Sequence, residues 1–163
     1  MFDDLIRIIN SGRMHGYQGD YPPVEPQRPG FIEFEHREGP YVYRDSYAGF
    51  LQFLGEEVVW REKDGLLLPV WSMVYKGGMV MQFGSNRKYS ESVYRFLKSA
   101  LRQGVSGAFA PRGPAKSGDS FIVYETQWEG DVVSFKGEEL IRDRSDVVYT
   151  CSFAGGLIIN DPV

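Results

Sequence analysis

The sequence has one cysteine, two histidines and no long apolar run, and each shortage excludes a class of protein. Cys151 alone cannot form an intramolecular disulfide, which fits a reducing cytosol. Two separated histidines and one cysteine do not make a metal-binding signature. No apolar stretch approaches the roughly 18 residues that span a bilayer. Residues 1–10 carry acids where a signal peptide needs a basic stretch, so we expect a cytoplasmic protein without a membrane partner.

The chain also lacks the short motifs of common enzymes. It has no phosphate-binding loop ending in lysine, no glycine-rich dinucleotide motif after a strand and no H-E-x-x-H zinc motif. No serine lies in a G-x-S-x-G nucleophile elbow. We therefore assign no catalytic residue, metal or cofactor, and the sequence favours a protein that is not an enzyme.

The composition is typical of a globular domain rich in strands. The 163 residues are 42% hydrophobic and 15% aromatic, enough for a sizeable core in one domain. Nineteen glycines, nine prolines and ten tyrosines favour strands and turns over a helical bundle. A net charge of −4 gives no general affinity for nucleic acid, so we expect no nucleic-acid partner.

A repeated segment dominates the pattern. Residues 55–80 recur, shortened, as residues 137–158. Each copy opens with Gly-Glu-Glu and two aliphatic residues, and each closes with a tyrosine-bearing apolar run followed by Gly-Gly. A longer hairpin tip at residues 63–66 accounts for the extra length of the first copy. The recurrence indicates an internal duplication.

Two segments have the apolar spacing of amphipathic helices. Residues 2–11 carry one apolar stripe, and Gly12 is expected to end this helix. Residues 90–103 carry another, with Ser90 as the predicted N-cap and Gly104 as the end.

Shorter segments alternate apolar and polar residues, as strands do. Gly55 is expected to interrupt one strand, and Pro69 indicates an edge or a bulge. The short turns between segments predict antiparallel meanders. The predicted strands are residues 31–36, 41–47, 50–54, 56–61, 66–75, 121–128, 131–136, 138–142 and 147–153.

Each half therefore consists of a helix, a Gly/Pro-rich loop (residues 12–30 or 104–118) and a meander of about four strands. This predicts an α+β fold with pseudo-twofold symmetry, in which the helices pack on the sheet or sheets. The prediction is one domain over residues 1–163, made of two pseudo-repeats at about 1–84 and 85–163. It leaves open whether the halves share a continuous sheet or close towards a barrel.

An ordered series of motifs runs through roughly residues 31–159. It comprises YRDSYAG (43–49), FLGEEVVW (53–60), PVWSMVY (69–75), FLKSAL (96–101), RGP (112–114), GD (130–131), FKG (135–137), Tyr149 and FAGGLI (153–158). The series resembles an uncharacterised bacterial domain family found alone or C-terminal to Xre-type helix-turn-helix segments. The resemblance implies a sensory or oligomerising module with no established reaction. No such segment precedes the first predicted helix here, so direct DNA regulation is not expected.

One strand and one loop provide candidate ligand contacts. Asp45 lies between two tyrosines on one predicted strand face, where a carboxylate must reach solvent or find a partner. The Arg-Gly-Pro guanidinium can bind a carboxylate or a phosphate through two hydrogen bonds. The predicted ligand site consists of Tyr43, Asp45, Tyr47, Trp71 and Arg112. The alternative for the aromatic residues is core packing between helix and sheet.

The two Gly-Glu-Glu elements offer a second candidate site. One carboxylate from each half could converge near the pseudo-twofold axis and bind a hard cation or share acid–base work. The alternative is that each pair opens a strand with one side chain facing solvent. The residues concerned are Glu56, Glu57, Glu138 and Glu139.

Charge is also unevenly distributed. Residues 87–116 hold seven basic side chains against one acid. Such a segment could attract an acidic partner, a phosphate ligand or nucleic acid, and the alternative is a solvated helix face plus a loop.

Three functional hypotheses follow. The first is a non-enzymatic, sensor-like module that binds an unknown small molecule or peptide. The second is a carboxylate-based enzyme, with or without the help of a metal, that uses the glutamates. The third is an interaction or oligomerisation domain, with a homodimer as one such assembly, that uses an exposed sheet edge or the basic helix.

Overall fold

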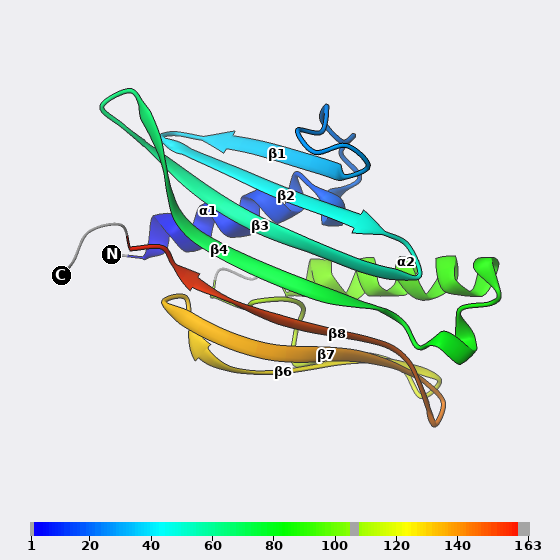
Figure 1. Cartoon of the computed structure of the whole chain (residues 1–163). Helices are drawn as coiled ribbons and strands as arrows, with labels where there is room; N and C mark the ends of the chain where they lie inside the picture. The colour runs from blue at the N-terminus through cyan, green and yellow to red at the C-terminus, as the bar shows by residue number, and fades with distance from the viewer. Residues whose placement is uncertain (1, 105–107, 160–163) are drawn as a thin grey trace.

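The computed structural model describes residues 2–104 and 108–159, which form one eight-stranded antiparallel sheet with two α-helices (Figure 1). The elements in chain order are α1 (Asp3–Met14), the 3-10 helix η1 (Tyr17–Gly19), β1 (Ile32–Glu38), β2 (Tyr41–Gly49), β3 (Gln52–Lys63), β4 (Leu66–Met79), the 3-10 helix η2 (Met81–Phe83), α2 (Arg87–Gln103), β5 (Lys116–Gly118), β6 (Ile122–Asp131), β7 (Ser134–Asp143) and β8 (Asp146–Leu157). The expected mixture of helices with antiparallel strands is therefore present.

The strand order is β1-β2-β3-β4-β8-β7-β6-β5. Within β1 to β4 and within β5 to β8, strands adjacent in the sequence pair as hairpins, and the two four-stranded meanders meet where β4 pairs with β8. Figure 1 shows this junction in the middle of the sheet. The meanders therefore form a single continuous sheet, which answers the question that the sequence left open.

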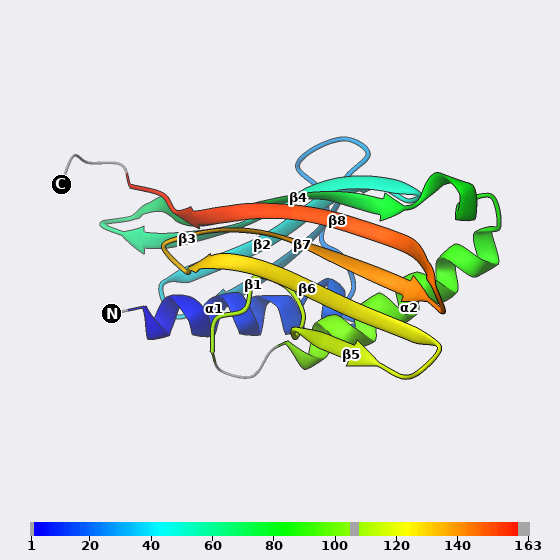
Figure 2. The ribbon, with the colours of Figure 1, turned by 90° about the horizontal axis from the view of Figure 1, so that it is seen from below.

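Both α-helices lie along the same face of the sheet (Figure 2). Buried residues of α1, such as Ile9, and of α2, such as Leu97, belong to the same apolar cluster as Tyr43 of β2. Side chains on the opposite face include Leu54 and Val74, which are more than half exposed. The core therefore lies on the helix side. No helix in the described part of the chain is long and apolar enough to cross a membrane.

Helix α1 does not end at Gly12, so that prediction was wrong. The helix continues to Met14, and a Cβ atom on Gly12 would lie 2.3 Å from Cγ of Tyr43. Glycine at this position lets the helix approach the tyrosine ring on β2 closely. The residue serves packing between helix and sheet rather than helix termination.

Helix α2 begins at Arg87, three residues before the predicted start. Asn86 is its N-cap, and its side-chain oxygen accepts a hydrogen bond of 3.1 Å from the backbone N–H of Tyr89. Ser90 was predicted to be the cap, but its hydroxyl donates to the Asn86 carbonyl at 3.2 Å. Asparagine satisfies the free N–H groups of the first turn as well as serine does. The predicted end at Gln103, with Gly104 as C-cap, is confirmed.

Two strand interruptions predicted at glycines are absent. Strand β3 runs through Gly55, and β7 runs through Gly137, so residues 131–136 and 138–142 do not form two separate strands. A Cβ atom on Gly55 would lie 2.4 Å from the Tyr75 hydroxyl oxygen. Glycine here makes room for a neighbouring aromatic ring rather than breaking the strand.

Two further details concern the strands. The register between β3 and β4 shifts between Val59 and Trp60, opposite Pro69, so the bulge expected near this proline is present. The short strand β5 lies in residues 104–118, which were predicted to be a loop, and of these residues 105–107 lie outside the described residues. Because β5 has only three residues, its alternation is too short to recognise in the sequence.

Candidate functional site

A cavity of about 310 Å³ lies where η1, α2 and strands β2 to β4 meet. Its walls are mainly aromatic and come from segments far apart in the sequence. The aromatic lining residues are Tyr17, Tyr47, Phe50, Phe53, Tyr75 and Tyr94. Two charged side chains, Asp45 and Arg112, also line the cavity.

Asp45 is a buried carboxylate on β2, with 7% of the residue exposed. Its Oδ1 atom accepts a hydrogen bond of 2.6 Å from the Tyr75 hydroxyl. In residues 2–104 and 108–159, no Lys, Arg or His side chain forms an ion pair with Asp45, and no donor is hydrogen-bonded to Oδ2. Asp45 therefore has one uncommitted oxygen at the cavity wall.

The pKa of Asp45 is raised to about 7. Burial is the main cause, because a low-dielectric environment disfavours the charged form, and the nearby Glu57 carboxylate adds to the effect. The Tyr75 hydrogen bond and the positive charges of Arg112 and Arg13 lower the pKa, but not enough to cancel the rise. Asp45 is therefore poised to gain or lose a proton near neutral pH.

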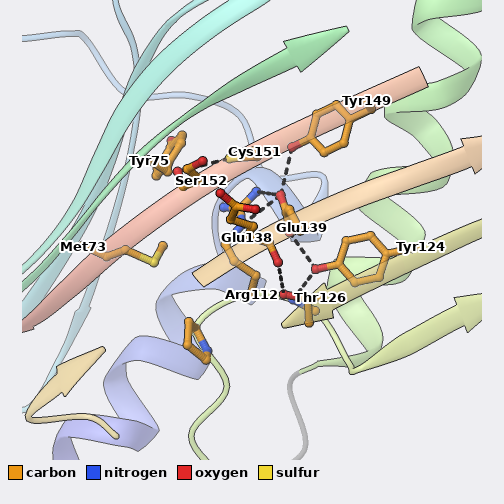
Figure 3. A network of polar contacts seen from close by, with 12 residues as sticks. Met73, Tyr75, Arg112, Tyr124, Thr126, Glu138, Glu139, Tyr149, Cys151 and Ser152 are labelled. Carbon is orange, nitrogen blue, oxygen red and sulfur yellow. Dashed lines mark hydrogen bonds and ion pairs between the residues drawn. The ribbon is translucent and has the colours of Figure 1, made fainter. Parts of the chain in front are cut away.

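Arg112 lies in the segment after α2 and is held by Glu139 of β7. Its Nε and Nη2 atoms donate hydrogen bonds of 3.2 and 2.9 Å to Glu139 Oε1. The hydroxyls of Tyr124 and Tyr149 donate to the same carboxylate at 2.6 and 2.8 Å. Figure 3 shows the three side chains converging on Glu139. The guanidinium also lies over the Tyr75 ring, 5.1 Å from its centroid.

A second buried ion pair anchors the same loop from the first half of the chain. Arg13, at the end of α1, donates from Nε to Glu57 Oε2 at 2.8 Å. Its other nitrogens donate to the backbone carbonyls of Ala110 and Pro111, at 2.7 and 2.8 Å. Arg13 thereby fixes the residues just before Arg112 and so positions the Arg112 side chain.

Three of the five predicted ligand-site residues, Asp45, Tyr47 and Arg112, line the cavity. Tyr43 and Trp71 instead belong to the packed core. Tyr43 is 1% exposed beneath α1, and the Trp71 indole N–H donates to the Val132 carbonyl at 3.2 Å.

The predicted acidic residues divide into two buried and two outward-facing side chains. Glu57 and Glu139 each pair with their own arginine, as described above. Glu56 forms an ion pair of 2.9 Å with Arg28, and Glu138 is exposed. Among the residues described, no group of three or more His, Cys, Asp or Glu side chains could hold a metal ion. Each Gly-Glu-Glu element thus has one inward and one outward acid.

Several important residues were not predicted. Tyr75 lies two and four residues after Met73 and Trp71, so strand alternation was a signal that could have placed it on the same face. Arg13 gave no usable signal, because its partner Glu57 lies 44 residues away. Much of the basic segment is paired internally, since Lys98 and Arg102 both contact Asp20.

Comparisons with known proteins add a family but no activity. The profile of the family described as "Domain of unknown function (DUF5680)" matches residues 45–158, which is more than half of the chain. Searches of curated proteins and of solved structures found no match.

Proposed function

We propose that this chain, which belongs to the DUF5680 family of domains of unknown function, binds a small, largely apolar molecule in the aromatic cavity without catalysing a reaction. The observation that carries the proposal is Asp45, a buried carboxylate with an uncommitted oxygen on the cavity wall. Small-molecule sites are typically apolar concavities with a few convergent polar groups, and about 310 Å³ lies at the lower end of their volume range.

A comparison of the two halves supports a special role for Asp45. In the strand register, Asp45 faces Glu57, and Thr126 faces Glu139 in the equivalent position of the second half. The Thr126 hydroxyl donates to the Glu138 carbonyl at 3.1 Å. Burying a hydrogen-bonded hydroxyl costs far less than burying a carboxylate. Packing alone therefore does not require the acid in the first half.

The same comparison supports the internal duplication that the sequence predicts. Each half has a buried glutamate at the second acid of Gly-Glu-Glu, and each glutamate binds an arginine from its own half. Arg13 lies in the last turn of α1, and Arg112 lies in the segment after α2. We take the two pseudo-repeats to be copies of one ancestral unit. The cavity then lies mainly in the first half, with Tyr94, Leu97 and Arg112 contributed by the second.

A groove beside the cavity could give the ligand access to it. A shallower groove along α2 shares Tyr17, Phe50 and Tyr94 with the cavity. The polar residues of the groove are Glu91, Arg95 and Lys98 of α2. A molecule could enter along this helix face. A sensor-like role agrees with the resemblance to bacterial domains that follow Xre-type segments.

The carboxylate-enzyme hypothesis has less support. A carboxyl group with a pKa of about 7 could exchange protons, and Asp45 has that property. However, that hypothesis relied on Glu56 or Glu57 with Glu138 or Glu139. Glu57 and Glu139 are each committed to a buried arginine, Glu56 pairs with Arg28, and Glu138 is exposed. Binding therefore explains the site with fewer assumptions than catalysis does.

The proposal can be tested by narrowing the cavity. Ile32 lies at its rim and is 43% exposed, so Ile32→Trp should obstruct the cavity without overpacking the core. Leu54→Trp, at a 53% exposed position on the opposite face, is the matched control. Small molecules released from natively purified protein are identified by mass spectrometry, and a library of small aromatic compounds is screened by thermal shift.

We expect the wild type and Leu54→Trp to bind the same compounds and Ile32→Trp to lose them. Unchanged binding by Ile32→Trp would show that the ligand lies elsewhere. The proposed function would be contradicted if the wild type released no small molecule after native purification and bound no compound in the screen.

A further inference from the structure

We infer that the ligand of this cavity carries a positively charged nitrogen that pairs with Asp45, an inference that rests on the proposed binding function. The argument depends on the balance of buried charges, on the free oxygen of Asp45 and on the aromatic walls.

Among the residues that the structure describes, the buried charges next to the cavity do not sum to zero. Three carboxylates, Asp45, Glu57 and Glu139, face two guanidiniums, Arg13 and Arg112, so the cluster has a net charge of −1 when all are ionised. The two glutamates use both arginines, and the charge left over is that of Asp45.

Asp45 is unusual in this respect among all the buried acids in the part of the chain that the structure describes. Besides Asp45, Glu57 and Glu139, the other buried acid is Glu33, and it has its own cation, because Arg44 Nη1 lies 3.0 Å from its Oε2 atom. Every buried carboxylate in the described residues except Asp45 thus has a guanidinium partner. A buried charge without a partner is costly, and a ligand cation would remove that cost.

Within residues 2–104 and 108–159, no side-chain cation pairs with Asp45 to supply the missing positive charge. The Nε and Nη2 atoms of Arg112 bind Glu139, and the Tyr75 hydroxyl that contacts Asp45 is neutral. A neutral ligand donor would satisfy the hydrogen-bonding capacity of Oδ2 but leave the negative charge in place. An ammonium or amidinium group satisfies both requirements.

The cavity walls are also suited to a cation. Aromatic rings attract cations through the negative potential of their faces. The protein's own cations already lie over two of the lining rings, Arg112 over Tyr75 at 5.1 Å and Lys98 over Tyr17 at 5.5 Å. An organic cation with an apolar body therefore matches both the walls and Asp45.

The inference can be tested with two probes of nearly equal size, 2-phenylethylamine and 2-phenylethanol. Both have the same apolar body and a hydrogen-bond donor, but only the amine is charged at neutral pH. Dissociation constants are measured by calorimetry for the wild type, for Asp45→Asn and for Glu138→Gln, whose exposed acid lies outside the cavity. We expect the wild type and Glu138→Gln to prefer the amine by about tenfold or more.

Asp45→Asn should lose this preference and still bind the alcohol, which also shows that the variant is folded. A wild type that binds both probes equally, or prefers the alcohol, would overturn the inference and leave the proposed function intact. Failure of both probes to bind at millimolar concentration would overturn the proposed function together with the inference.

A second measurement uses the wild type alone. The charged and titratable groups around Asp45 are Glu57, Arg13, Arg112 and the hydroxyls of Tyr17, Tyr43, Tyr47 and Tyr75. The pKa of Asp45 is raised to about 7, whereas the pKa values of the four tyrosines and of Arg112 are raised further above their already high ordinary values. Because a cation binds the ionised carboxylate, amine affinity should fall from about pH 8 to about pH 5 while alcohol affinity does not. Equal pH dependence of the two probes would contradict the inference.

Discussion

The Tyr75 hydroxyl on β4 donates a hydrogen bond of 2.6 Å to Asp45 on β2, across the strand β3 that lies between them. Strands two places apart in a sheet are separated by about 10 Å, so the tyrosine must lean over β3 to reach the acid. Gly55 makes this possible, because it pairs with Tyr75 and has no side chain to block the ring. The glycine of the first Gly-Glu-Glu element is therefore part of the arrangement that holds Asp45.

The pH dependence of stability should reveal the raised pKa of the Asp45 carboxyl group. The pKa of this carboxyl is raised from 3.8 to about 7, so between these pH values the folded state holds a proton that the unfolded chain has released. Below about pH 4, Asp45 contributes a few kcal/mol to the free energy of unfolding. This contribution is lost as the pH rises through about 7. Relative to Asp45→Asn, the wild type should lose free energy of unfolding across this interval.

Urea denaturation of both proteins at several pH values measures this difference. The asparagine keeps an acceptor for Tyr75, so the comparison isolates the charge. A constant difference in free energy between about pH 4 and about pH 8 would contradict the raised pKa of Asp45.

Gly12→Ala tests two effects that would change the stability of the protein in opposite directions, helix propensity and packing. Helix propensity alone predicts a stabilisation of about 1 kcal/mol, since Gly12 lies inside α1. The new Cβ atom would lie 2.3 Å from Cγ of Tyr43, and such overpacking typically costs about 1–3 kcal/mol. We expect packing to prevail and the variant to unfold at lower urea concentration.

Gly84→Ala is the control, because the nearest atom to its added Cβ would lie 3.5 Å away and its φ of −75° suits alanine. Its stability should stay within about 0.5 kcal/mol of the wild type. A more stable Gly12→Ala would show that α1 can move away from β2 without penalty.

Glu139→Gln should be among the most destabilising conservative substitutions. Glu139 accepts hydrogen bonds from Arg112, Tyr124 and Tyr149, and it is 1% exposed. Its replacement leaves the Arg112 guanidinium buried without a counter-ion, which costs about 3–5 kcal/mol. Thermal or urea unfolding checks this value. Glu138→Gln, one residue away but exposed, should change stability by less than about 0.5 kcal/mol, and equal losses in the two variants would refute the explanation.

The corrected start of α2 can also be tested. Asn86→Ala removes the side-chain acceptor for the Tyr89 N–H and should cost about 1 kcal/mol. Ser99→Ala changes an exposed position in the middle of the same helix and should cost less than about 0.5 kcal/mol. If both substitutions had the same effect in urea denaturation, Asn86 would not act as a cap.

Local sequence patterns predicted the helices and strands better than they predicted the contacts between them. The α2 stripe and the alternation in β2 follow from short-range periodicity, which the sequence displays directly. The pairing of β4 with β8 does not, because no turn links these two strands and their register depends on the whole sheet. The continuous sheet therefore could not be predicted.

Glycines were the main source of error. A glycine that ends an element and a glycine that lets a distant ring approach have the same appearance in a sequence. Gly12 and Gly55 are of the second kind, and their partners, Tyr43 and Tyr75, come from other elements. The candidate site was predicted in part for a similar reason. Asp45 stood out as an acid among tyrosines, whereas Arg13 becomes significant only when Glu57 is beside it.

The junction of β4 and β8 has a consequence for how the chain folds. Every other pairing between the named strands joins consecutive strands and can form by closing a local hairpin. Local contacts form quickly, whereas pairing of strands distant in sequence requires a long loop to close first. The rate-limiting event should therefore be the docking of two preformed meanders along β4 and β8. Substitutions at this junction, such as the paired Tyr75 and Phe153, should slow folding more than equally destabilising substitutions in β1 or β5.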